Sequence, residues 1–143
     1  MAYIPKDAEW YLADLVNEIH VAGDIRRMVH VNTVLVRSDS PTEAYERAME
    51  LGVSQAGEPY LNPEGMLVST RFVGIKELSV IYDKLEHGAE LFFEEKVDVT
   101  PAQIAEMIPA KEELSVFSAV EPSKGPDYSS GRISDDYDGK SQA

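Results

Sequence analysis

The chain has 143 residues, of which 43% are hydrophobic and 27% charged, and these proportions are typical of one globular domain rather than of a disordered chain. It contains no cysteine, which excludes disulfides, thiolate metal sites and cysteine nucleophiles. Its 26 acidic and 13 basic side chains give a formal charge of −13, which disfavours nucleic acid and anionic membranes as partners. The simpler role of this charge is solubility, and the alternative is attraction to a basic protein partner.

The first residues, Met1 to Asp7, lack a basic start followed by an apolar run. No stretch of the chain approaches the roughly 20 apolar residues of a membrane helix. We therefore expect a cytoplasmic protein that does not enter a membrane.

Two runs rich in β-branched and aromatic residues, 10–21 and 25–37, flank the turn signal Ala22-Gly23-Asp24. They predict an antiparallel hairpin in which the numbers of opposed residues sum to 47. This register places seven mainly apolar side chains on one face as a core side: Tyr11, Ala13, Leu15, Ile19, Met28, Val34 and Val36. The opposite face carries Trp10, Leu12, Val16, Val29, Val31 and Leu35 beside charged residues, so we expect a second layer or a dimer partner to cover it.

Ser40-Pro41-Thr42-Glu43 has the form of a capping box with proline at the first helical position. It predicts a helix from Pro41 to Leu51, with Gly52 as the left-handed residue that follows the helix. Residues 53–65 contain two prolines and two glycines and predict a loop that ends in the turn 62–65.

Strand signals resume at 66–74, 78–82 and 89–97, with a bend near Gly74 and a turn at His87-Gly88. Thr100 and Gln103 predict the cap of a short helix that ends at Pro109. Residues 111–120 fit an edge strand or a helical turn equally well. The sequence thus predicts an α+β fold, an antiparallel sheet of about five strands in the order ββαβββα, packed by one main helix and a short C-terminal helix.

We assign residues 1–120 to this single domain. Residues 121–143 contain one Ile and no Leu, Val, Phe or Met, which predicts a disordered acidic tail. The tail contributes a net charge of −2, from five acidic and three basic residues, so most of the acidity belongs to the domain.

None of the strong catalytic or nucleotide-binding motifs occurs, and this absence favours a protein that is not an enzyme. The chain has three histidines, His20, His30 and His87, and the hairpin register separates them, which disfavours a metal site built on them. The same register places His30 opposite Asn17 and close to Asn32. These three residues are the candidate ligand-binding group, and the alternative is that they only satisfy one another's hydrogen bonds. We predict no catalytic residue, metal ligand or cofactor.

Four stretches, Trp10-Tyr11-Leu12-Ala13, His30 to Val36, Ser40 to Tyr45 and Arg71-Phe72-Val73-Gly74, resemble a family of short bacterial proteins, domain of unknown function 4288. The resemblance runs from about Trp10 to Glu95. It implies a small α+β protein, and it brings no known catalytic residue.

Three hypotheses on function follow. The first is a non-enzymatic protein-binding module, of an immunity-like, phage-related or regulatory kind, that binds a basic protein through its acidic surface. The second is a small-ligand sensor or small enzyme built around His30. The third is a self-associating structural protein that buries the second face of the hairpin in a homodimer.

Overall fold

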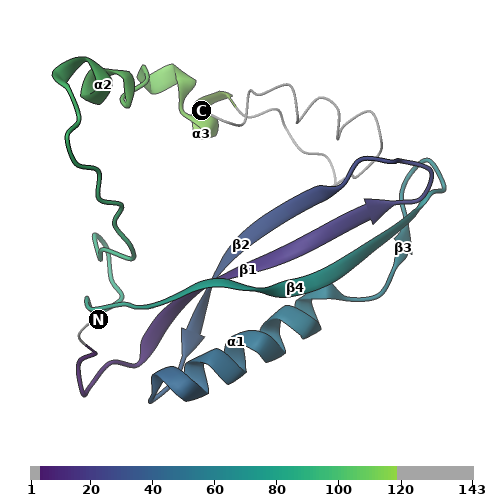
Figure 1. Cartoon of the computed structure of the whole chain (residues 1–143), viewed down its shortest axis with the longest axis horizontal. Coiled ribbons are helices and arrows are strands. Elements are labelled where there is room, and N and C mark those ends of the chain that lie inside the picture. Colours follow the sequence, from purple (N-terminus) through teal and green to yellow (C-terminus); the bar gives the residue numbers. More distant parts are fainter. Residues whose placement is uncertain (1–3, 119–143) are drawn as a thin grey trace. The chain divides into compact units, whose positions relative to one another are not determined.

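A computed structural model describes residues 4–118 of the chain, so the tail predicted over 121–143 lies outside the described residues. Residues 4–92 and residues 93–118 form two parts, which we describe one at a time. The first part contains the sheet and the long helix α1, and the second contains short helices (Figure 1). Within 4–118, no helix is both long enough and apolar enough to cross a membrane.

The sheet of the first part is antiparallel and has the strand order β2-β1-β4-β3. Its strands are β1 (Trp10–Val21), β2 (Met28–Arg37), β3 (Tyr60–Leu61) and β4 (Leu67–Val80). The α+β class and the antiparallel sheet are therefore confirmed, with four described strands where about five were predicted. β1 lies at the centre, between β2 and β4 (Figure 1).

The register of the first hairpin is confirmed, because β1 and β2 pair from Trp10↔Arg37 to Ile19↔Met28 without a shift. The predicted start of the second strand at residue 25 is wrong, since β2 begins at Met28. Asp24 explains the longer connection. Its N–H donates to the Val21 carbonyl at 3.0 Å, and its carboxylate binds the Arg26 guanidinium at 2.6 Å. These bonds hold the chain in a loop before it can pair with β1.

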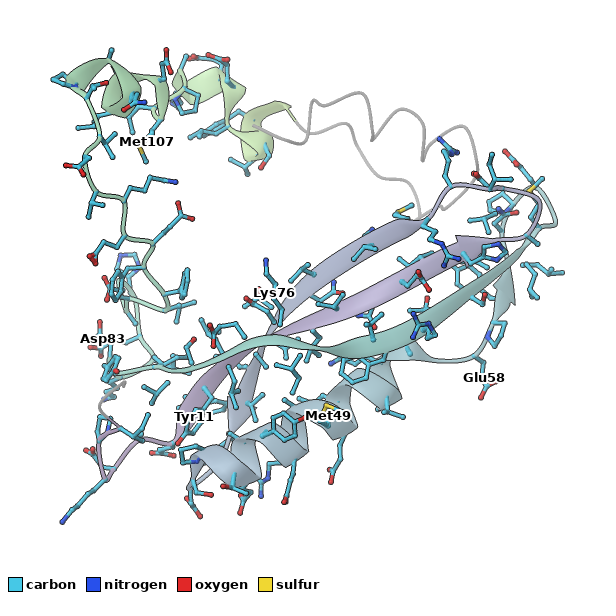
Figure 2. The ribbon with its side chains drawn as sticks, viewed as in Figure 1. Tyr11, Met49, Glu58, Lys76, Asp83 and Met107 are labelled. Carbon is cyan, nitrogen blue, oxygen red and sulfur yellow. The ribbon has the colours of Figure 1, made fainter. Side chains whose placement is uncertain are left out.

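Helix α1 (Pro41–Ala56) covers one face of the sheet, which we call the inner face (Figure 1). Its predicted start is confirmed: the Ser40 hydroxyl accepts the Glu43 N–H at 3.2 Å. Small residues on its inward side let the helix approach the sheet closely. The core between them is formed by Tyr11 (Figure 2), Ala13, Leu15, Val36, Ala44, Ala48 and Val80.

The predicted end of this helix at Gly52 is wrong. Gly52 is buried inside α1, and the helix runs one turn further to Ala56. A Cβ at Gly52 would lie 2.3 Å from the Phe72 ring of β4, closer than carbon atoms can approach. Gly52 is therefore required by close packing of the helix against β4 and not by a turn.

β4 joins the two strands predicted at 66–74 and 78–82 into one. The predicted bend is absorbed by two shifts in the β1–β4 register, one at Val73 and one at Lys76, each of which inserts one extra residue into β4. β4 is preceded by the short β3 and by the predicted turn. In that turn the Gly65 N–H donates to the Asn62 carbonyl at 2.9 Å.

The fifth strand predicted at 89–97 is absent from the described sheet. Its alternating pattern fits a strand, but a strand also needs an edge to pair with, and pattern alone does not supply one. The turn before it is present, with Gly88 at a φ of 87°.

The second part, residues 93–118, contains α2 (Pro101–Glu106), the 3₁₀ helix η1 (Lys111–Glu113) and α3 (Ser115–Ser118). The predicted capping box is confirmed, since Thr100 and Gln103 each accept the other's backbone N–H. For residues 111–120 the sequence left an edge strand and a helical turn open. The described residues of this stretch, up to 118, form helical turns. Every residue from 100 to 117 is exposed.

Candidate interaction surface

The face of the sheet opposite α1, here called the outer face, carries five apolar side chains at its middle. Strand alternation directs Val16 of β1 and Val29, Val31 and Leu35 of β2 to this face. On β4, Val73 is the extra residue between Phe72, which lies against Gly52 on the inner side, and Gly74, which pairs with Val16, and its side chain is exposed. We call Val16, Val29, Val31, Leu35 and Val73 the outer patch.

The outer patch lies open to solvent. Exposed fractions are 51% for Val29, 48% for Val31, 45% for Leu35 and 50% for Val73, and Val16 between them is half-buried. Val16 pairs directly with Val31 and lies beside the β4 shift that contains Val73. Val16, Val29, Val31 and Val73 are therefore neighbours across three strands. Leu35 is separated from them by Asp14 and Thr33, whose side chains share a hydrogen bond of 2.7 Å on the same face.

One end of the outer face is covered by the chain itself. Leu91 and Phe92 line a depression together with Leu12 and Thr33, and Leu12 is buried there. The segment after β4 therefore returns to the outer face at this end and reaches Asp14 and Thr33, which lie between Leu35 and the rest of the patch.

The other end of the outer face is polar and ion-paired. Glu18 of β1 binds Arg27 at 2.8 Å on one side and Arg71 of β4 at 3.1 Å on the other. Hydrogen bonds from Arg27 and then Arg71 hold the pKa of Glu18 below its usual range. His20 lies beside this group in a shallow depression. An apolar centre with such a polar margin is the usual anatomy of a protein interface.

The three predicted ligand-binding residues lie together at the β1–β2 pair. The Asn17 amide donates to the Asn32 side-chain oxygen at 2.9 Å, and His30 pairs with Asn17 across the strands. Asn17 is 8% exposed, and its side-chain oxygen has no hydrogen-bond partner among the described residues. Asn32 is exposed, and His30 is half-buried. The group is therefore assembled as the sequence predicted, and its role stays a prediction.

Metal chemistry has no evident site in the described part of the chain, where no three His, Asp or Glu side chains come together in a way that could hold an ion. The outer patch is an apolar surface that another molecule could cover.

Sequence reasoning found most of the outer patch but missed Val73 and Arg71. Both belong to β4, whose pairing with β1 joins residues more than 50 positions apart in the chain. Val73 is the extra residue of a bulge, so alternation along β4 alone does not place it and the β1–β4 pairing is needed.

Comparison with known proteins gives a family and nothing on activity. No curated protein and no solved structure matches the chain. The model of the family described as a domain of unknown function, DUF4288, matches residues 10–93, which is well over half of the chain and includes the whole sheet and α1. The chain therefore belongs to the DUF4288 family.

Proposed function

We propose that this protein is a non-enzymatic protein-binding module and that the outer patch is its docking surface. The observation that carries the proposal is a group of exposed apolar side chains on three neighbouring strands of a sheet whose other face is already filled by α1. Removing apolar area from water contributes about 25 cal/mol per Å². A partner that covers the patch gains this energy without any rearrangement of the core.

Charge indicates the kind of partner. Residues 1–92 carry 15 acidic and 8 basic side chains, a net charge of −7. At the polar end of the outer face, the two arginines beside Glu18 are already bound to that carboxylate. A basic protein with an apolar strip would therefore be attracted by the body as a whole and held by the patch.

Capture from a lysate of the native host, with the chain as bait, tests this function. The test variant is Val73→Glu, which places a charge in the patch. The matched control is Val53→Glu, which places the same charge on the exposed side of α1, where Val53 is 68% exposed. Wild type and Val53→Glu should capture the same basic protein at low salt, and Val73→Glu should not.

Direct binding of the captured protein, once purified, completes the test. Val73→Glu should weaken binding by tenfold or more, since a charge at the centre of an interface costs about 1.4 kcal/mol or more. Equal binding by Val73→Glu and Val53→Glu would remove the outer patch as the docking surface. Finding no partner at low salt would argue against the module itself.

A second function, sensing of a small ligand, is favoured by one observation, the buried side-chain oxygen of Asn17 that lacks a described partner. Buried polar atoms normally have partners, so a ligand donor could complete this one beside His30. Screening a metabolite library by thermal shift tests it. A ligand that stabilises wild type but not Asn17→Ala would support this function, and a screen without such a ligand would leave the group a structural one.

A further inference from the structure

The outer edge of β2 is the longest regular edge of the described sheet. Which of its backbone groups face outward follows from one bond: the Ser38 N–H donates to the Glu9 carbonyl at 3.0 Å. In an antiparallel pair, hydrogen-bonded residues alternate with residues whose N–H and C=O point away. The backbone N–H and C=O groups of the even-numbered β2 residues therefore bond to β1. Those of the odd-numbered residues point to the open edge.

Four of these outward residues are available to another strand: Val29, Val31, Thr33 and Leu35. The fifth, Arg37, is already engaged, because its carbonyl accepts a hydrogen bond from the Arg47 guanidinium of α1 at 2.6 Å. No described strand lies beyond β2 in the sheet order. The open edge thus has a defined length that ends where α1 blocks it.

The usual devices that protect an edge from pairing are missing here. β2 has no register shift against β1, and its sequence contains no acidic residue, lysine or proline. Its side chains on the outer face are mostly apolar. An edge of this kind is a template for an added strand.

The charges at this edge favour a second copy of the chain over an acidic or a basic peptide. The arginines near its ends are each ion-paired within the chain, Arg27 with Glu18 and Arg37 with Glu9 at 2.9 Å. The strand is therefore locally neutral, although the whole protein carries −13. Two such edges can approach without the repulsion that the acidic surfaces would cause elsewhere.

The backbone N–H and C=O groups at the open edge of β2 are also complementary to those of a second β2 edge. When two β2 edges run antiparallel about a two-fold axis at Asn32, Val29 opposes Leu35 of the second copy and Val31 opposes its Thr33. Each of these pairs would exchange two N–H···O bonds, and all four available residues are used. The Val29–Leu35 pairs are apolar, and apolar cross-strand pairs add to the stability of the pairing.

We propose that two copies of the chain associate through their β2 edges, antiparallel and centred on Asn32, to form one continuous sheet across both molecules. The inference shares Val29, Val31 and Leu35 with the proposed docking surface, but it uses the backbone edge of β2 and does not involve the side chains of Val16 and Val73, so the two can be tested separately. It places the two outer patches side by side on one surface.

The mass of the full chain in solution, measured by sedimentation over a wide range of concentrations, tests the proposal. Wild type should be a dimer in exchange with monomer. Val31→Pro removes an N–H that points to the open edge, so it should keep the fold and weaken dimerisation by about a hundredfold, since both copies lose a bond. Val73→Glu should leave the dimer unchanged, which separates this result from loss of the docking function.

Crosslinking supplies a second test that does not depend on removing a backbone N–H. The chain has no cysteine, and Asn32→Cys would place two thiols opposite each other across the axis. This variant should form a disulfide-linked dimer in a glutathione buffer. Val53→Cys on α1 is the control and should not form a disulfide-linked dimer under the same conditions. A wild-type monomer at all concentrations, or no more crosslinking by Asn32→Cys than by the control, would overturn the proposal.

Discussion

The two long edges of the sheet are built in different ways. The β2 edge keeps an unbroken register against β1 and ends at a carbonyl held by α1. The β4 edge is interrupted twice, at Val73 and Lys76, and its first residues are covered by β3. Lys76 also adds a charge there, on the side of the sheet away from α1 (Figure 2). Bulges, charges and a covering strand are recognised ways to prevent edge pairing, and all three are on one edge.

This difference indicates that the β4 edge resists pairing with a strand of another molecule and that the β2 edge permits it. The core does not explain it, because both β2 and β4 contribute residues to the same cluster under α1. The predictions below test the assignment of the two edges and the contacts that hold them in place.

The largest loss of stability is expected from proline at a β2 residue whose backbone N–H bonds to β1. Val34→Pro removes an N–H that bonds to β1 and should lower the free energy of unfolding by about 3 kcal/mol or more. Val31→Pro, three residues away, should cost about 1 kcal/mol, because its N–H points to the open edge. Denaturant unfolding at a concentration where the protein is monomeric measures both. Equal losses of stability would show that we have wrongly assigned which β2 residues bond to β1 and which point to the open edge.

A smaller effect is expected where α1 supports β4. Gly52→Ala forces a methyl group into the space of the Phe72 ring, 2.3 Å from its nearest carbon. The expected loss is about 1–3 kcal/mol, even though alanine favours a helix. Phe72→Leu in the same chain should recover part of it, which identifies the clash as the cause. A Gly52→Ala variant as stable as wild type would mean that β4 can move away from the helix.

The smallest effect is expected at Glu18, which links the loop before β2 to β4 through Arg27 and Arg71. Because its pKa is lowered in the folded state, the carboxylate stabilises the fold above its unfolded value of about 4.5, and this contribution is lost as the pH falls through the lowered value. Thermal melting of wild type and Glu18→Gln should therefore differ at neutral pH and converge in acid. A difference that persists unchanged in acid would contradict the role of these ion pairs.

Much of the first half of the fold was predictable from local signals. Gly23 and the alternation around it gave the β1–β2 register, and Ser40 and Thr100 marked the starts of two helices. These signals are local because turns and caps involve residues three or four positions apart.

The errors have one physical origin, contacts between residues far apart in the chain. Gly52 looks like the end of a helix until Phe72 is known to lie against it. The two strands expected around Gly74 are one strand because β1 pairs along both. Residues 89–97 have the composition of a strand, but composition does not provide an edge to join. For the candidate site, alternation gave the β1 and β2 members, and Val73 required the β1–β4 pairing.

The bulges of β4 also bear on the size of any assembly. Joining two copies through β2 uses up both regular edges and leaves β4 at each outer margin of the joint sheet. Unlimited growth into a fibril requires every subunit to present two edges that can pair. With Val73 and Lys76 interrupting the second edge, association should stop at two copies, so an exposed and largely apolar strand need not lead to polymerisation.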